Sequence, residues 1–103
     1  AVNQARMDNG TTPLSIAAQQ GYTEVVDLLI GSGAAVNHAG TDNDVTPLFI
    51  AAQHGHDSTV ALLIELGADT NHCMVSAGWS PLFVAAYSGH TEVVRILLAA
   101  GAD

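Results

Sequence analysis

The sequence predicts an all-α repeat fold: a solenoid of stacked helix-turn-helix units with protruding β-hairpin loops between them. The first observation is internal repetition, because Thr12-Pro13-Leu14 recurs as Thr46-Pro47-Leu48 and Ser80-Pro81-Leu82, each time 34 residues further along. The second is that two short apolar segments with helical spacing follow each triplet. The third is a stretch rich in Asn, Asp, Gly and Thr after each pair of segments, a composition typical of turns.

The repetition divides the chain into three units, which we expect to span residues 1–34, 35–68 and 69–103. A length of 103 residues is that of one domain. A single unit cannot bury its own apolar stripe, whereas stacked units share one continuous core. The three units are therefore expected to form one continuous repeat domain, in which no segment is left over for a separate catalytic domain.

The first helix of each unit is defined by its ends. In the first unit Thr12 is a good N-cap, and Pro13 occupies the first helical position, where its missing N–H costs nothing. Gly21 ends this helix. Between them, the alanine pair 17–18 lets neighbouring helices approach closely, near the lower end of the usual interaxial distances.

The second helix of each unit follows a short turn. In the first unit we expect Thr23 to cap it and Glu24 to favour its dipole from the first turn. Residues 25–30 then form an apolar stripe close to the helical period. Gly33 supplies the left-handed residue that commonly ends a helix. The polar stretch that follows is long enough for a protruding hairpin.

The composition excludes several classes of function. Nearly half of the residues are hydrophobic (49%), which is too many for a disordered segment. The formal net charge is −8, with only two basic side chains, Arg6 and Arg95. Because Lys and Arg make the contacts to nucleic acids and to anionic membranes, neither is expected as a partner.

Other features of the sequence favour an intracellular, cytoplasmic location. The single cysteine, Cys73, excludes an internal disulfide framework and favours a reducing compartment. No apolar run reaches the length of about 18 residues that a membrane helix needs. The first residues also lack the pattern of a signal peptide.

The repeated residues closely resemble the ankyrin repeat. Residues 89–98, Gly-His-Thr-Glu-Val-Val-Arg-Ile-Leu-Leu, followed by Gly101-Ala102-Asp103, are nearly the family's pattern, and the resemblance covers the whole chain. It implies a non-enzymatic module that binds a protein. Two departures predict a non-standard hairpin: the ankyrin repeat is usually about 33 residues long, and Ser15, Phe49 and Phe83 replace the family's His after Thr-Pro-Leu.

The residues with catalytic or zinc-binding chemistry form no convincing site. Cys73 and its neighbour His72 would point in different directions on an extended segment, and no third residue orients the imidazole. His38 and His72 occupy equivalent positions in stacked units, about 10 Å apart, whereas one zinc ion needs its ligands at about 2.1 Å. We therefore predict that the protein is not an enzyme.

Calcium is the one cofactor that the sequence leaves open. Five side chains with oxygen donors lie at equivalent hairpin tips of the first two units: Asp8, Asn9, Asp42, Asn43 and Asp44. Calcium takes six to eight oxygen ligands from carboxylates, amides and backbone carbonyls. The alternative is that these residues only favour turns. Both interpretations stand.

The candidate protein-binding surface consists of positions that vary between the units while the scaffold stays constant. They would line the concave face formed by the hairpins and the first helices. They are Arg6, Met7, Thr11, Gln19, Gln20, Thr41, Val45, Gln53, His54, Met74, Val75, Trp79, Tyr87 and Ser88. The third unit is the most apolar, and Trp and Tyr are enriched at interface hot spots. The alternative for Trp79 is that it packs on its own hairpin.

The function predicted from these observations is a protein–protein interaction module that acts through this concave surface. The acidic charge favours a basic partner and speeds its encounter. Five of the ten carboxylates are expected on or near the second helices, away from the concave face, and two more directly follow these helices. A calcium-binding ankyrin module is one alternative, and a structural scaffold fragment of a longer ankyrin array is another. Uncovered apolar ends would also favour self-association.

Overall fold

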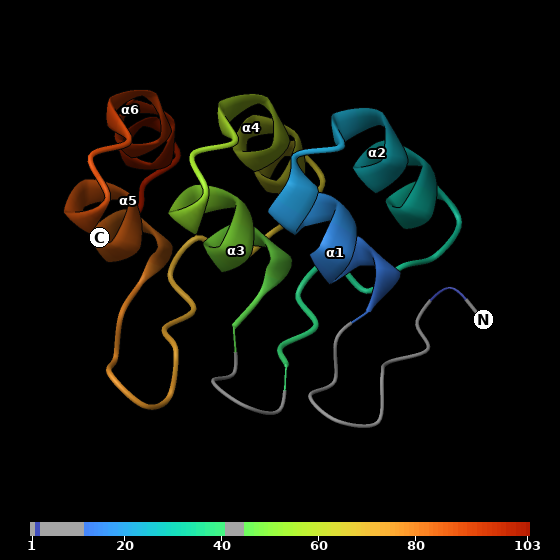
Figure 1. Ribbon diagram of the computed structural model, residues 1–103, viewed down its shortest axis with the longest axis horizontal. Coiled ribbons are helices and arrows are strands. Elements are labelled where there is room, and N and C mark those ends of the chain that lie inside the picture. The colour runs from blue at the N-terminus through green and yellow to red at the C-terminus, as the bar shows by residue number, and fades with distance from the viewer. Residues whose placement is uncertain (1, 3–11, 41–44) are drawn as a thin grey trace.

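The computed structural model describes residues 2, 12–40 and 45–103, and within these ranges it contains six helices and no strand. The helices form three stacked pairs (Figure 1). Their bounds are α1 Pro13–Gln20, α2 Thr23–Gly31, α3 Pro47–Gln53, α4 Asp57–Glu65, α5 Pro81–Tyr87 and α6 Thr91–Ala99. The predicted all-α repeat fold is therefore confirmed. In the described part of the chain, no helix is long and apolar enough to cross a membrane.

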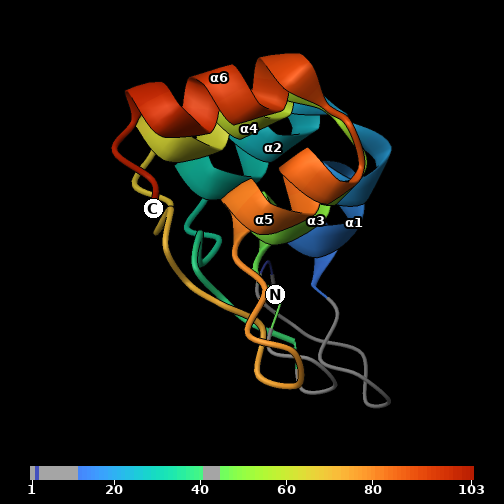
Figure 2. The same cartoon turned by 90° about the vertical axis from the view of Figure 1, so that its left-hand side faces the viewer.

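The helices lie in two layers. One layer contains α1, α3 and α5, the other contains α2, α4 and α6, and each helix packs on its equivalent in the next pair (Figure 2). The connecting loops project from the same side of the stack. In each of the loops before α3 and α5, a backbone hydrogen bond joins the outgoing and the returning segment. The Gly40 N–H donates to the Val45 carbonyl at 3.0 Å, and the Met74 N–H donates to the Trp79 carbonyl at 2.9 Å.

The first helices begin at the predicted caps. The Thr12 hydroxyl accepts a hydrogen bond from the Ser15 N–H at 3.2 Å, and the Thr12 N–H donates to the Ser15 hydroxyl at 3.4 Å. This reciprocal pair satisfies two backbone donors at the helix start. Thr46 and Ser80 cap α3 and α5 in the same way through one bond each, to the amides of Phe49 and Phe83. Such caps each stabilise a protein by about 1 kcal/mol.

The second helices begin differently from the prediction. Thr23 is the first residue of α2 rather than its cap, Tyr22 holds the cap position, and no side chain caps this helix. The Thr23 hydroxyl instead lies 2.9 Å from the Thr59 hydroxyl of α4. A side chain expected to make a local bond therefore links two neighbouring helix pairs.

The core is made of alternating small and large apolar side chains. Ala18, Ala51, Ala52 and Ala85 are completely buried, which lets the first-layer helices pack closely. Leucines fill the space between the layers, and the fully buried ones are Leu14, Leu48, Leu63 and Leu97. Truncating such a leucine to alanine typically costs about 2–5 kcal/mol, so this shared core is the main source of stability.

Histidines join neighbouring helix pairs. The His56 Nε2–H donates to the carbonyl of Gln19 at 2.8 Å, and the His90 Nε2–H donates to the carbonyl of Gln53 at 3.0 Å. Each imidazole lies over the glycine that ends the preceding first helix. A Cβ atom at Gly21 would come within 2.6 Å of His56 Nδ1. Gly21 also has a φ of 75°, a region that other residues rarely adopt.

Candidate functional site

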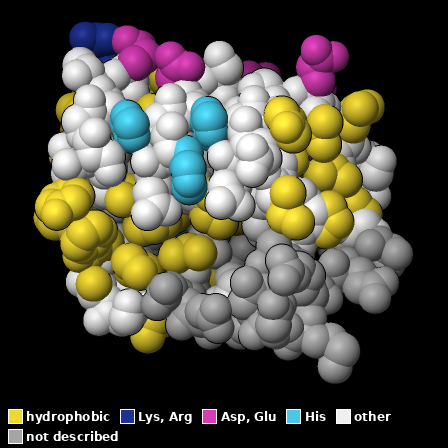
Figure 3. Space-filling view, in the orientation of Figure 1, with side chains coloured by type: hydrophobic (Ala, Val, Ile, Leu, Met, Phe, Trp, Pro, Cys, Tyr) yellow, Lys and Arg dark blue, Asp and Glu magenta, His cyan; other side chains and the backbone are white. Residues whose placement is uncertain are grey.

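The candidate site lies on the face formed by α1, α3, α5 and the loops that precede α3 and α5, called here the first-helix face (Figure 3). Short helices end on this face at equivalent positions, so their last residues form a row. The exposed members of that row are Gln19, Gln20, Gln53, His54, Tyr87 and Ser88. Helices α1 and α3 end in polar residues, whereas α5 ends in an aromatic residue.

Three aromatic side chains form a cluster on this face: Trp79, Phe83 and Tyr87, called here the aromatic cluster. The Trp79 ring centroid lies 4.7 Å from that of Phe83 and 5.2 Å from that of Tyr87. The Phe83 and Tyr87 rings stack at 6.4 Å. Trp79 is half-buried, whereas Phe83 and Tyr87 are exposed. The three side chains therefore form one contiguous aromatic cluster.

The sequence analysis found Trp79 and Tyr87 but missed Phe83. It treated Phe83 only as a replacement of the histidine that ankyrin repeats usually carry after Thr-Pro-Leu. The missed signal is spacing, because the three aromatic residues are four positions apart, and residues four apart share one face of a helix. Trp79 precedes α5 by two residues, and its ring still packs edge-on against Phe83.

Phe83 is accessible only because of its place in the stack. The equivalent residue of α3, Phe49, is 4% exposed, whereas Phe83 is 48% exposed. Helix α5 covers this side of α3, and no described residue covers α5 in the same way. A phenylalanine at this position is therefore part of the core in α3 and part of the surface in α5.

The remaining predicted contact residues divide into three groups. Val45 and Met74 are half-buried and pack against the core, so they support the loops as much as they offer contact surface. Val75 is exposed on the loop before α5. Arg6, Met7, Thr11 and Thr41 lie outside the described residues. Only Trp79 and Tyr87 of the predicted set are brought into direct ring contact.

The described histidines of this face have structural partners. The His54 and His56 rings stack at 6.1 Å with an interplanar angle of 5°, and the His54 Nδ1–H donates to the Ile50 carbonyl at 2.9 Å. Within residues 12–40 and 45–103, no group of three or more His, Cys, Asp or Glu side chains is placed to hold a metal ion. The arrangement therefore ties α3 and its turn together.

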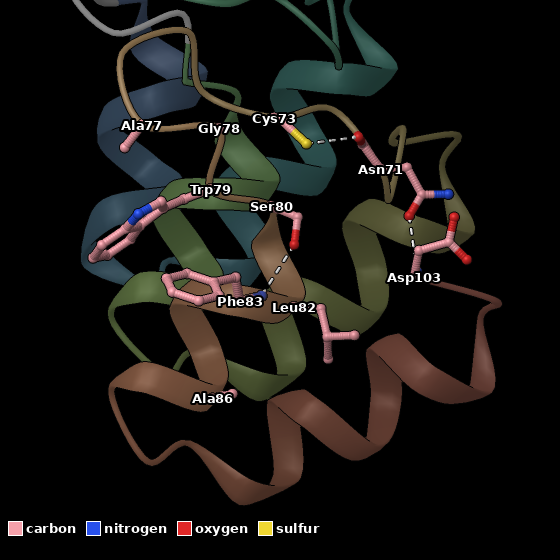
Figure 4. Close-up of a pocket in the computed structure, with 10 residues that line it drawn as sticks. All are labelled: Asn71, Cys73, Ala77, Gly78, Trp79, Ser80, Leu82, Phe83, Ala86 and Asp103. Atoms are coloured by element: carbon pink, nitrogen blue, oxygen red, sulfur yellow. Dashed lines mark hydrogen bonds between the residues drawn. The ribbon is translucent and has the colours of Figure 1, made fainter.

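A pocket of about 650 Å³ opens beside the aromatic cluster, at the outer side of α5 (Figure 4). Its lining includes Trp79, Leu82, Phe83 and Ala86 together with the exposed Cys73. The Cys73 thiol donates a hydrogen bond to the Asn71 carbonyl at 3.5 Å, and the Asn71 Oδ1 atom accepts one from the Asp103 N–H at 3.0 Å. The pocket is mostly apolar, with polar groups at one rim.

Comparison with known families decides what kind of protein this is. A family model of ankyrin repeats, in three copies, matches residues 14–103. The chain belongs to the ankyrin-repeat family. No curated protein matches it significantly. Ankyrin repeats are typically non-catalytic modules that bind proteins, and the stacked helix pairs agree with this family.

The charges of this ankyrin-repeat protein are segregated between its two layers. Glu24, Asp27, Asp57, Glu65 and Glu92 are exposed on the second helices, and Figure 3 shows the acidic side chains along the edge away from the loops. Arg95 forms an ion pair with Glu92 on α6. These five carboxylates therefore lie along one edge of the first-helix face rather than lining it.

The calcium prediction for this ankyrin-repeat protein falls on the loop tips. Its five candidate ligands, Asp8, Asn9, Asp42, Asn43 and Asp44, all lie outside the described residues. The loop before α5 has Ser76-Ala77-Gly78 at the equivalent place, which offers no carboxylate. Calcium binding therefore stays a prediction for the first two loops.

Proposed function

We propose that this ankyrin-repeat protein is a non-enzymatic binding module that holds a protein partner on its first-helix face, with the aromatic cluster as the centre of the contact. The observation that carries this proposal is the cluster itself: two exposed aromatic rings, Phe83 and Tyr87, that are both in contact with the half-buried ring of Trp79. In many interfaces a few clustered residues, among which Trp and Tyr are enriched, contribute most of the binding energy.

The scaffold supports binding because it is already ordered. Tyr87 and Phe83 project from a short helix that Ser80 caps, and their rings are held by contact with Trp79. Association costs free energy when side chains and loops lose their freedom on binding. A surface whose rings are already packed loses less of that freedom, so more of the contact energy appears as affinity.

The charge distribution favours a basic partner. The chain has a formal net charge of −8, and the described acidic side chains on the second helices lie along one edge of the binding face without occupying it. Such a field attracts a cationic segment and speeds its encounter, most strongly at low salt. The exposed faces of Tyr87 and Phe83 also attract Arg or Lys side chains through cation–π contact.

The test is a selection of binding peptides from a random library on the immobilised protein. A double variant, Trp79→Val with Tyr87→Gln, carries the residues found at the equivalent positions 45 and 53, so the scaffold already accepts them. The selected peptides should bind this variant at least about tenfold more weakly, which is the loss expected of hot-spot residues. They should also be rich in Arg and Lys.

The matched control is Arg95→Ala, which removes a charge from the outer layer and should leave peptide binding unchanged. Peptides that bind the double variant as well as the original protein would contradict the assigned face. A library that yields no binder would instead favour the alternative in which the chain is a structural part of a longer ankyrin array.

A further inference from the structure

Three histidine side chains lie at the turns between the two helix layers and are called here the histidine group. His54 follows the last residue of α3, and His56 and His90 directly precede α4 and α6. His54 is exposed, and the other two are half-buried. Figure 3 shows histidine side chains between the acidic edge and apolar side chains that lie nearer the loops. Imidazole is the side chain whose charge ordinarily changes between pH 5 and pH 8, so mild acid alters the charge of this face.

Each ring of the histidine group uses one nitrogen as a donor to a backbone carbonyl. The His54 Nδ1–H donates to the Ile50 carbonyl at 2.9 Å. The His56 Nε2–H donates to the Gln19 carbonyl at 2.8 Å, and His90 makes the equivalent bond to the preceding helix pair. Because an imidazolium ion donates from both of its nitrogens, these bonds persist when the rings are charged. Protonation therefore changes the charge of the face while its scaffold stays in place.

The surroundings of the histidine group are negative while the rings are neutral. In the first layer, α1 and α3 contain no titratable side chain, and α5 contains only Tyr87. The titratable side chain of the turn before α2 is Tyr22. The second helices carry the remaining groups, which are Glu24, Asp27, Asp57, Glu65, Glu92 and Arg95. Arg95, the one cation among them, forms an ion pair with Glu92. Positive charge that mild acid adds to this face therefore comes from the histidines themselves.

We propose that the histidine group is a proton-controlled switch, which weakens the binding of a basic partner to the first-helix face as the solution becomes mildly acidic. This inference rests on the proposed function, in which an Arg or Lys side chain of the partner contacts the aromatic cluster. Tyr87 ends α5 and His54 follows the end of α3, and these helices pack directly on each other. The axes of packed helices are about 8–10 Å apart, and a new positive charge at that separation repels a bound cation.

Two of the three rings act from nearly the same place. His54 and His56 stack in parallel with their centroids 6.1 Å apart, so their charges add at one point of the face. Each proton also reduces the net negative charge that attracts a basic partner. Both effects have the same sign, and both are therefore expected to lower the affinity as the pH falls.

Binding and protonation of the histidine group oppose each other. Because the bound cation disfavours the charged rings, binding at about pH 6.5 should release protons, whereas binding at about pH 8 should release almost none. Repulsion between exposed charges is also screened by salt, and the Debye length falls to about 3 Å at about 1 M ionic strength. Salt at this concentration should therefore remove most of the pH dependence.

The test uses isothermal titration calorimetry with a peptide from the selection described above. The peptide has an acetylated N-terminus and contains no His, Asp or Glu, so its own charge stays constant in this pH range. Between about pH 7.5 and about pH 5.5 at low salt, the dissociation constant for the original protein should rise about fivefold. His54→Gln introduces the residue found at the equivalent position 20 and should reduce this rise to about twofold.

The matched control is His72→Gln, which introduces the residue found at the equivalent position 4. His72 lies in the loop before α5, outside the histidine group, so this variant should keep the full pH dependence. Circular dichroism at both pH values checks that each protein is folded. If His54→Gln is unfolded, His54→Ser replaces it, because serine is the residue at the equivalent position 88.

The outcomes separate the switch from the function on which it rests. A dissociation constant that is equal at both pH values would overturn the switch and leave the binding face intact. A pH dependence that His54→Gln leaves unchanged, or that His72→Gln removes, would also overturn it. A library that yields no binder would overturn both the switch and the proposed function.

Discussion

Helices α3 and α5 share the sequence Pro-Leu-Phe followed by an aliphatic residue and Ala-Ala, yet their phenylalanines have different environments. Helix α3 lies between two neighbours, and its Phe49 is part of the core. Helix α5 has a neighbour on one side only among the described residues, and its Phe83 joins an exposed aromatic cluster. The comparison shows that position in the stack, rather than local sequence, decides whether a residue stabilises the fold or offers a binding surface.

The largest expected difference between the two helices concerns these phenylalanines. Phe49→Ala should lower the free energy of unfolding by about 3–5 kcal/mol, because it leaves a cavity in a packed core. Phe83→Ala should lower it by about 1 kcal/mol or less, because half of the ring already faces solvent. Urea denaturation followed by circular dichroism measures both values. Equal losses would contradict the assigned difference in burial.

The glycines that end α3 and α5 give a second comparison. Gly55→Ala should cost about 2–3 kcal/mol, because it combines backbone strain with a clash against His90 that disturbs its bond to the Gln53 carbonyl. Gly89→Ala meets open space and should cost only the strain, about 1 kcal/mol. The two thermal midpoints, measured side by side, test this. A Gly89→Ala variant that is as unstable as Gly55→Ala would show that the histidine contact contributes nothing.

Threonines at the start of the second helices give a smaller comparison. Thr23→Ala removes the hydroxyl that meets Thr59 of α4 and should cost about 1 kcal/mol, the usual value of one hydrogen bond. Thr91 stands at the equivalent first position of α6 and is exposed, so Thr91→Ala should change stability by less than about 0.5 kcal/mol. Chemical denaturation of both variants provides the measurement, and an equal effect would contradict the inter-helix role of Thr23.

The smallest expected effect concerns the loops. If the acidic loops of the first two units bind calcium, calcium at its dissociation constant should add about 0.4 kcal/mol of stability, which is a rise in Tm of about 2–3 °C. The matched variant is Asp42→Asn with Asp44→Asn, which should lose the rise. Thermal melts with calcium and with a chelator provide the test. Equal midpoints for the original protein would exclude a stabilising calcium site.

Much of the fold could be predicted because its signals are local and repeated. The cap predicted at Thr12 is confirmed, and Thr46 and Ser80 at the equivalent positions cap α3 and α5 in the same way, because each cap acts within three residues. The prediction for Thr23 was wrong because its hydroxyl has a better partner 36 residues away, which no local pattern reveals. The candidate site was half predicted: Trp79 and Tyr87 were identified by type, whereas Phe83 was hidden by its likeness to the buried Phe49.

The sequence by itself determined the period of the repeat, the ends of the first helices and the apolar faces, because each of these depends on interactions between residues within one or two turns. The tertiary structure alone decided which equivalent residues are core and which are surface. It also decided that His56 and His90 reach carbonyls 37 residues away. The physical reason is that burial depends on the neighbour that covers a side chain, and in a stack of similar units only position supplies that neighbour.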